Sequence, residues 1–432
     1  MEKIIVIGAG IGGLASAYFL GKAGFNVEVF EKEKEENLAY DWHDDVAPDI
    51  FQRLSIPLPD KKFYFPKHDW SFVPPHSKYY VAVHSTGERD ISIDRKELSR
   101  MLVELAKPYA KINFGTAVQS LIIKDGSVAG VKVEGNKKSA SLVIDSSGAL
   151  SPFRKSLPDS FMIEKEPRPD EVFYAYRGFY ERLKDIEVKE HTHKVYLRHL
   201  GEKGISWCRR DSADQADILI GRVDKLEKSV IDNALNELKK DNPDVGEKVV
   251  KAGRICVIPV RYPLLKMVGD GYAAIGDAAF MTIPMLGSGI ASSLLAGFLL
   301  ADTVIKGGTK VDNLWNYQVR FFHEAGAKHM GVDVLKRWML KAESQDIKFL
   351  FERKVISQTD MERAGSGNLV KMPFKELLKK VAAGYSRLGL LLRLKKVIKN
   401  MQKAVECGLE IPQTYDMEAI KLWQSRVKKF YE

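Results

Sequence analysis

The chain has 432 residues, 45% of them hydrophobic, and a formal net charge of +10, which fits a globular protein of two or three domains with sizeable cores. The positive excess is concentrated after Gly331, where 21 Lys and Arg stand against 12 Asp and Glu, so nucleic acid is excluded as the partner of the nearly neutral main fold. Three widely spaced cysteines form no C-x-x-C pair, which excludes a disulfide scaffold or zinc site and indicates a reducing cytoplasm: Cys208, Cys256 and Cys407.

The first predicted element is a buried parallel strand at residues 3–8 that opens onto a glycine turn. The first glycine of such a turn permits a tight bend, the second lets the backbone approach a pyrophosphate, and the last lets the next helix pack on the strand. That helix is predicted to run to Gly24 and to offer free N–H groups to phosphates. The glycines of the turn are Gly8, Gly10, Gly12 and Gly13.

A second strand at residues 26–30 ends in Glu31, about twenty residues past the glycines. An acid at this place can accept hydrogen bonds from both ribose hydroxyls and would repel a ribose 2′-phosphate. Residues 3–31 therefore predict a site for FAD or NAD in preference to NADP. Because the N-terminus enters a core strand directly, no signal peptide is expected.

A polar loop rich in titratable groups is predicted from Lys32 to Asp45. Within it, His43 and Asp44 form either an acid/base pair beside the cofactor or part of a solvated loop anchored by Trp42. The sequence leaves both interpretations open.

Extended segments are predicted at residues 62–84, where aromatic residues and prolines lead away from the nucleotide-binding part into a second sheet. Asp94 then caps a helix that continues to Leu105, because Glu97 stands three residues after it in a capping box.

Short strands follow, with a hairpin joined through Asp125-Gly126 and an apolar strand at residues 141–144. From Glu166 to Val260 the longer alternating segments predict an antiparallel sheet with one buried face, interrupted by a helix at about residues 225–238. Residues 278–301 carry no charge and are long enough to span a membrane, but Pro284 and two glycines indicate a turn followed by a buried helix.

Three motifs then align in order: the glycine turn with Glu31, Asp145-Ser146-Ser147-Gly148 with Arg154, and Gly276-Asp277-Ala278-Ala279 followed by Pro284 and Gly287-Ser288-Gly289. Together with Arg95 they resemble the FAD-dependent oxidoreductases of the geranylgeranyl reductase and p-hydroxybenzoate hydroxylase superfamily, to about residue 305. The resemblance implies FAD as the cofactor, with Asp277 binding the ribityl hydroxyls and Arg95 contacting the cofactor. It also implies that the helix after Gly287, Ser288 and Gly289 directs its positive end at the flavin.

The closer likeness is to the geranylgeranyl reductase branch, through residues 281–290 and a helical tail containing Tyr317 and Gly326. That branch reduces double bonds of prenyl chains on lipids, so hydride transfer from flavin to an apolar or prenyl-lipid substrate is expected, with His43 or Asp44 as the proton donor. One departure is notable. The branch's aromatic-x-Trp-x-Phe-Pro signature is reduced here to Trp207 within Ile205-Ser206-Trp207-Cys208-Arg209-Arg210. The aromatic residues expected at the substrate cavity, each of which could equally be core, are Trp70, Tyr176 and Trp207.

Partners follow from the same resemblance. No second G-x-G-x-x-G occurs, so electrons are expected from transiently bound NAD(P)H or from a ferredoxin-like carrier.

Residues 388–405 form a basic amphipathic helix. Its apolar stripe either docks on the protein, which is the commoner arrangement, or lies on an anionic membrane. The expected location is the cytoplasm, with the inner face of the membrane as a peripheral site.

The predicted fold is α/β, with a Rossmann-like FAD-binding domain, an inserted antiparallel substrate sheet and C-terminal helices. The expected limits are 1–60, 85–160 and 265–310 for the FAD domain, 61–84 and 161–264 for the substrate domain, and 311–432 for the helices. Two alternative functions stay open: a flavin monooxygenase that hydroxylates an aromatic substrate, and a membrane-associated electron-transfer flavoprotein. No metal is expected.

Overall fold

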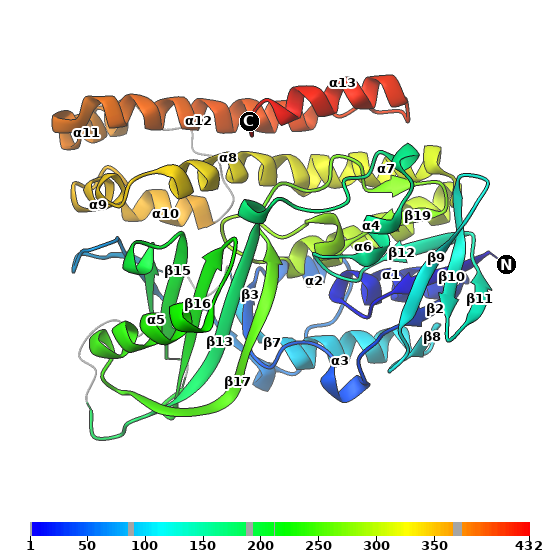
Figure 1. Cartoon of the computed structure of the whole chain (residues 1–432), viewed down its shortest axis with the longest axis horizontal. Helices are drawn as coiled ribbons and strands as arrows, with labels where there is room; N and C mark the ends of the chain where they lie inside the picture. The colour runs from blue at the N-terminus through cyan, green and yellow to red at the C-terminus, as the bar shows by residue number, and fades with distance from the viewer. Residues whose placement is uncertain (1, 85–89, 187–192, 211, 366–373) are drawn as a thin grey trace.

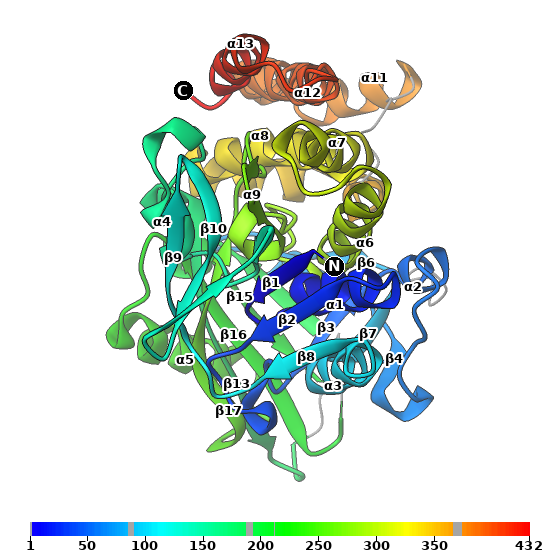
Figure 2. The same cartoon turned by 90° about the vertical axis from the view of Figure 1, so that its right-hand side faces the viewer.

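The computed structural model describes residues 2–84, 90–186, 193–210, 212–365 and 374–432. Figure 1 shows two sheet regions side by side, with the helices that follow residue 310 lying across one side of both. Figure 2 shows these helices in two layers, with α12 and α13 outermost.

A six-stranded sheet carries the N-terminal strand inside it, in the order β18-β19-β12-β1-β2-β8. Neighbouring strands are parallel except for β18 with β19, and β1 is buried from Ile4 to Ile7, as a strand covered on both faces should be. The strands are β1 (Lys3–Ile7), β2 (Asn26–Phe30), β8 (Ala110–Asn113), β12 (Leu142–Asp145), β18 (Val268–Gly269) and β19 (Tyr272–Ala274).

Helix α1 (Ile11–Lys22) lies between α3 (Arg95–Ala106) and α6 (Ile290–Gly307). A Cβ on Gly297 would stand 2.7 Å from the Cβ of Ala15, so this glycine allows α6 to pack closely on α1. By length and composition α6 could cross a membrane, but 67% of that stretch is buried inside the protein. The prediction of a turn followed by a buried helix is confirmed.

Local turn and cap chemistry also behaves as predicted. Asp94 accepts the N–H of Glu97 at 3.0 Å and caps α3. Asp125 and Gly126 both have positive φ and close the hairpin of β9 (Val118–Lys124) and β10 (Ser127–Val133), beside which lies β11 (Asn136–Ser139). Two short helices complete this part of the chain, α2 (Asp49–Arg53) and α4 (Pro152–Ser156).

A seven-stranded sheet, in the order β17-β13-β16-β15-β14-β5-β6, forms the second region. It is antiparallel except for β14 with β5, and one of its faces packs on α5 (Lys228–Asp241). The strands are β5 (Trp70–Val73), β6 (Val81–Val83), β13 (Val172–Arg182), β14 (His193–Leu197), β15 (Gly204–Arg209), β16 (Gln215–Val223) and β17 (Val245–Pro259).

The expectation of a loop through residue 45 was wrong in part, because His43–Val46 is strand β3. It pairs with β7 (Ile91–Asp94), which also pairs with β4 (Tyr64–Pro66). The charged side chains of β3 are tolerated in a strand because arginines from other elements pair with them: Asp44 with Arg95, and Asp45 with Arg209.

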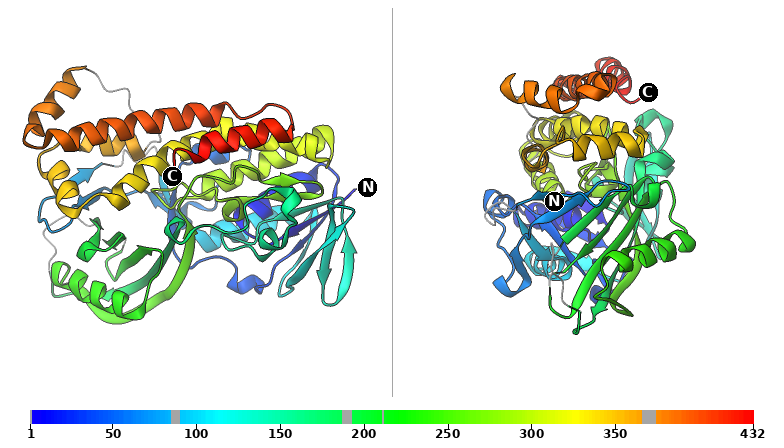
Figure 3. Two further views of the ribbon diagram at one scale, coloured as in Figure 1. Left: turned by 45° about the horizontal axis from the view of Figure 1, so that its top comes forward. Right: turned by 90° about the vertical axis from the view of Figure 1, so that its left-hand side faces the viewer.

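The helices after residue 310 form two layers over the sheets (Figure 3). A π-helical turn at Phe322–Gly326 joins α7 to α8, and a Cβ on Gly408 would stand 2.7 Å from Met330 Sδ, so α12 packs closely on α8. The helices are α7 (Val311–Phe321), α8 (Ala327–Lys341), α9 (Ser344–Glu352), α10 (Gln358–Gly365), α11 (Phe374–Ala383), α12 (Leu388–Leu409) and α13 (Met417–Lys428).

The α/β fold with an inserted, largely antiparallel sheet and C-terminal helices is thus the one predicted. Strands of the six-stranded sheet come from residues 3–145 and 268–274, on either side of most of the seven-stranded sheet. The domain limits stay a prediction, and the start of the segment at 85–89 lies outside the described residues.

Candidate cofactor and active site

The glycine turn forms a backbone cradle at the end of β1. Gly8 has φ of +93°, and a Cβ on it would stand 2.6 Å from the carbonyl oxygen of Ser146. A Cβ on Gly13 would stand 2.5 Å from the carbonyl oxygen of Gly8. Gly10 is the N-cap residue of α1, and Gly12 lies in its first turn. Because the first N–H groups of a helix have no intrahelical partner, this cradle fits a pyrophosphate.

Glu31 is buried beside the glycine turn. One carboxylate oxygen accepts the N–H of Ala9 at 2.7 Å, and the other accepts the N–H of Glu33 at 2.8 Å. These two bonds fix the orientation of the carboxylate. Since an ionised carboxylate has about four acceptor positions, Glu31 can still accept bonds from two ribose hydroxyls.

Asp277 lies in the short turn Gly276–Ala279 that follows β19. The hydroxyl of Thr282 donates to Asp277 Oδ1 at 2.7 Å, and no other donor among the residues that the structure describes bonds to this carboxylate. Burial raises the pKa of Asp277, although Thr282 and Arg95 act in the opposite direction. A half-buried carboxylate with acceptor capacity left over fits a ligand that carries hydroxyl groups, such as the ribityl chain of FAD.

The segment of Gly287, Ser288 and Gly289 leads from this turn into α6. A Cβ on Gly289 would stand 2.9 Å from Thr282 Oγ1 and 3.6 Å from Asp277 Oδ1, so the missing side chain keeps that carboxylate approachable. Ser288 donates its hydroxyl to the carbonyl of Asp45 at 3.1 Å. The start of the 18-residue helix α6 therefore lies next to Asp277 and β3.

Asp44 is paired with two arginines. Arg95 Nη1 lies 2.8 Å from one carboxylate oxygen and Arg177 Nη1 lies 3.0 Å from the other. Burial on its own would raise the pKa of Asp44, but the two guanidinium groups outweigh burial and hold this pKa below its ordinary value. Asp44 is therefore ionised at neutral pH, which suits it better to orienting the arginines than to donating a proton.

His43 lies on the same strand, with its ring 5.1 Å from that of Phe65. Its backbone carbonyl accepts a hydrogen bond from Arg177 Nη2 at 2.8 Å. His43 and Asp44 are thus neighbours on β3, but alternation along the strand directs their side chains to opposite faces, Asp44 to Arg95 and His43 to Phe65. Their roles in the reaction and in cofactor binding stay predictions.

Tyr40 is a part of this cluster that the motif pattern did not single out. Its ring stacks on Trp42 with centroids 4.3 Å apart, and the guanidinium of Arg254 lies 4.9 Å from the ring. Burial raises the pKa of Tyr40 to about 12, and Cys256 and Asp277 are close enough to add to this. Neither Arg254 nor Cys256 belongs to a recognisable motif. They are two residues apart on the long strand β17, and so they share one of its faces.

The tryptophans expected at a substrate cavity lie together. The rings of Trp70 and Trp207 meet edge to face at 5.7 Å. The guanidinium of Arg177 lies 5.3 Å from Trp207 and 5.0 Å from Trp42. We call these rings, with Arg177 in their middle, the aromatic row; in order they are Tyr40, Trp42, Trp207 and Trp70. The row leads from the Asp277 region across the seven-stranded sheet.

Tyr176 does not belong to this row. It packs in the cluster on the opposite face of the sheet, against α5, and its hydroxyl lies 2.9 Å from that of Tyr180. The neighbouring residue Arg177 points to the aromatic row instead, because successive side chains of a strand alternate between its faces. The structure therefore separates Tyr176 from Trp70 and Trp207.

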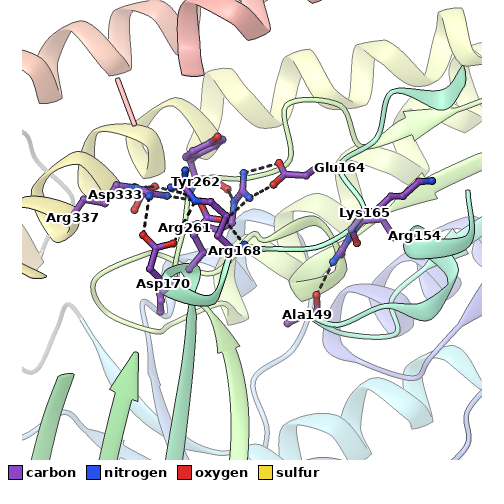
Figure 4. A network of polar contacts seen from close by, with 12 residues as sticks. Ala149, Arg154, Glu164, Lys165, Arg168, Asp170, Arg261, Tyr262, Asp333 and Arg337 are labelled. Carbon is purple, nitrogen blue, oxygen red and sulfur yellow. Dashed lines mark hydrogen bonds and ion pairs between the residues drawn. The ribbon is translucent and has the colours of Figure 1, made fainter. Parts of the chain in front are cut away.

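Arg154 ties together two of the loops that carry the motifs, and Figure 4 shows it beside Ala149 and Lys165. Its guanidinium is fully buried and donates to the carbonyls of Ala149, after β12, of Ala278, beside Asp277, and of Lys165. Burial lowers the pKa of Arg154, although the group stays cationic at neutral pH.

A neighbouring network reaches from the same region to the C-terminal helices. Arg261 pairs with Glu164 and Glu171, and Arg337 of α8 pairs with Glu171 and Asp333 (Figure 4). This network fixes α8 against the end of β17.

Comparisons with known proteins agree with this geometry. A family described as "NAD(P)-binding Rossmann-like domain" matches residues 6–46. The chain is 23% identical over 427 residues to the digeranylgeranylglycerophospholipid reductase of Sulfolobus acidocaldarius, covering 95% of this chain and 93% of that protein.

Two solved structures are similar in fold. A geranylgeranyl bacteriochlorophyll reductase-like protein from Thermoplasma acidophilum has a TM-score of 0.73 at 18% identity, over 92% of this chain and 100% of that one. PqsL, a probable FAD-dependent monooxygenase from Pseudomonas aeruginosa, has a TM-score of 0.58 at 18% identity, over 81% of this chain and 99% of that one.

The class of the protein follows from the cradle, the two carboxylates and these similarities: it is an FAD-dependent oxidoreductase. The resemblance to the superfamily of the geranylgeranyl reductases and p-hydroxybenzoate hydroxylase is confirmed, and the similarity to curated reductases extends over almost the whole chain.

Proposed function

We propose that the protein is a reductase that saturates double bonds of an apolar, prenyl-lipid substrate. The observation that carries this proposal is the aromatic row, which would give an apolar chain a surface that ends at Tyr40, near Asp277. The similarity over 95% of the chain to a protein named digeranylgeranylglycerophospholipid reductase supports the same substrate class.

FAD, when bound, would supply the hydride. The chain's own residues hold and surround the reacting partners. The glycine cradle and Glu31 would bind the dinucleotide end, and Asp277 would bind the ribityl hydroxyls. Asp44 holds Arg95 and Arg177 in place beside the site. Trp70 and Trp207 would contact the apolar chain of the substrate.

Saturation of a double bond also requires a proton at the second carbon. His43 and Asp44 were the candidates from sequence, and the ionised state of Asp44 favours His43 of the two. Tyr40 is a third candidate, because a pKa of about 12 keeps its phenol protonated at neutral pH and it lies near Asp277.

The electron donor is proposed to be NAD(P)H or a ferredoxin-like carrier that binds transiently. We place the reaction at the inner face of the membrane, where a prenyl lipid is found, with residues 388–405 as the contacting segment.

The test is mass spectrometry of a geranylgeranyl lipid incubated without air with the chemically reduced protein. A gain of hydrogen pairs on the lipid is expected, and the same incubation with oxidised protein is the control. An unchanged lipid beside flavin that stays reduced would overturn the proposal.

A monooxygenase is the second candidate, favoured by the fold shared with PqsL. It predicts NAD(P)H oxidation and oxygen uptake that an aromatic substrate stimulates. If instead neither substrate is turned over and the protein passes electrons to another protein, an electron-transfer flavoprotein is the better description.

A further inference from the structure

One face of α12 is accounted for by the fold. Leu390, Met401, Ala404 and Cys407 are buried, and Gly408 brings this face close to Met330 of α8. Docking on the protein, which was the commoner of the two arrangements expected for the apolar stripe, therefore holds for this face.

A second apolar stripe stays exposed where α11 ends and α12 begins. The exposed fractions are 41% for Val381, 71% for Tyr385, 55% for Leu388 and 67% for Leu392. Leu388 and Leu392 stand four residues apart and share one side of α12, while Val381 of α11 and Tyr385 in the turn between the two helices precede them in the chain. Single exposed apolar residues are ordinary, whereas a continuous stripe of large ones marks a contact surface.

Lysines continue this stripe along α12. Lys395, Lys396, Lys399 and Lys403 are all exposed, and no ion pair is recorded for them among the residues that the structure describes. By contrast, Arg387 and Arg393 pair with Asp346 of α9. The chain from 377 to 405 has eight Lys and Arg and no Asp or Glu.

We infer that this part of the surface, the docking face, binds the surface of an anionic lipid bilayer. The docking face consists of four apolar residues and four lysines: Val381, Tyr385, Leu388, Leu392, Lys395, Lys396, Lys399 and Lys403. The apolar side chains would enter the interface, and the lysines would lie at the level of the anionic headgroups, each strengthening binding by about fivefold. Because α12 is in the outer helical layer, the face can approach a flat surface (Figure 2). The inference rests on the proposed function only for the purpose of such binding, which is access to a lipid substrate.

Charge favours a bilayer over the other occupants of an apolar stripe. A second copy of the chain would bring the same lysines against these, and like charges would repel. An anionic membrane supplies both an apolar interior and a dense negative surface, which matches the order of apolar and basic residues along the face.

The experiment is flotation of the full FAD-loaded protein with phosphatidylcholine vesicles, with and without phosphatidylglycerol. The protein is expected to float with the anionic vesicles at low salt and to remain at the bottom with the neutral ones. The double variants Leu388→Ser/Leu392→Ser and Lys395→Glu/Lys396→Glu are each expected to lower the bound fraction at least fivefold.

Matched controls lie elsewhere on the surface. Leu183→Ser changes a 44% exposed leucine that follows β13, and Lys61→Glu/Lys62→Glu changes an adjacent exposed pair far from α12 in sequence. Both are expected to bind vesicles as the unchanged protein does. Equal losses in variants and controls, or no flotation of the unchanged protein, would overturn the inference.

Two further readouts separate this inference from the proposed function. Reduction of a short, water-soluble prenyl alcohol by the chemically reduced protein should be the same in all variants. If that reduction is absent while flotation behaves as expected, the proposed function fails and the docking face stands. A change of oligomeric state in Leu388→Ser/Leu392→Ser, seen by size-exclusion chromatography, would assign the stripe to self-association and overturn the inference.

Discussion

Arg177 Nη1 lies 3.0 Å from Oδ1 of Asp44, so an ion pair joins strand β13 of the seven-stranded sheet to strand β3. Arg177 also binds Asp217 of β16 through two nitrogens, at 2.9 and 2.6 Å, and both of these side chains are buried. Arg95, the residue expected to contact the cofactor, binds the other oxygen of Asp44. The Asp44 carboxylate therefore links Arg95 to the sheet that carries the aromatic row. Asp44 thus connects the seven-stranded sheet with α3 and with the small sheet of β3, β7 and β4.

Replacing Asp44 by Asn should lower the free energy of unfolding at pH 7 by about 1–3 kcal/mol, because Arg95 loses its paired carboxylate and Arg177 keeps only Asp217. The folded-state pKa of Asp44 is below its unfolded value, so its contribution is present above the unfolded pKa and is lost as pH falls through the folded one. Urea denaturation should therefore show the difference between the two proteins shrinking below about pH 4.

The control for this prediction is Asp41→Asn, three residues before Asp44. This change breaks a more exposed ion pair, between Asp41 and Lys251. It should change stability by under about 0.5 kcal/mol. Equal effects of the two changes would show that Asp44 does not hold the sheets. If His43→Asn/Asp44→Asn reduces bound substrate at the unchanged rate, neither residue is the proton donor.

Features set by neighbouring residues could be predicted from the sequence. The glycine turn, the Asp94 cap and the Asp125-Gly126 hairpin each depend on chemistry within a few residues, and each was found as predicted. Strand β3 was not predicted, because its charged sequence becomes a strand only through pairing with β7 and with distant arginines.

The composition of the site shows the same limit. Alternation along β13 places Tyr176 and Arg177 on opposite faces, but sequence does not tell which face meets the cofactor region. Tyr176 was therefore grouped with Trp207, although it lies on the α5 face. Arg254 joins the cluster through side-chain contacts with Ala39 and Tyr40, more than two hundred residues before it, for which no local pattern exists.

Arg154→Lys should weaken both stability and FAD binding. A lysine ammonium lacks the planar fork that reaches the carbonyls of Ala149, Lys165 and Ala278 together. We expect a loss of about 2–3 kcal/mol in the free energy of unfolding and a roughly tenfold rise in the FAD dissociation constant, measured by quenching of flavin fluorescence. Arg426→Lys, in an exposed pair with Glu410, is the control and should change neither quantity. FAD binding that is unaffected by Arg154→Lys would show that the two loops hold their positions without it.

Trp207 and Tyr176 give a paired test of the aromatic row. Trp207→Ala should raise KM for a prenyl substrate roughly tenfold, because it removes apolar contact area from the row. Tyr176→Phe should leave KM unchanged and cost about 1 kcal/mol of stability, since it removes only the hydroxyl contact with Tyr180. Steady-state kinetics with both variants checks this. A KM that rises for Tyr176→Phe and not for Trp207→Ala would place the substrate on the other face of the sheet.

Stability should fall in mild acid through three histidines that the fold holds neutral. Burial lowers the pKa of His193 to about 3 and those of His199 and His329 to about 4. The unfolded chain binds protons at these rings below about pH 6.5, so stability rises with pH between the folded and unfolded values. Each histidine should cost about 2 kcal/mol at pH 5 relative to neutral pH. His329→Leu isolates one of them, because this side chain is 5% exposed and packs beside Phe321. Urea denaturation at pH 7.5, 6 and 5 should show a shallower loss for the variant. Equal slopes for the two proteins would mean that His329 takes up its proton in the folded state as readily as in the unfolded chain.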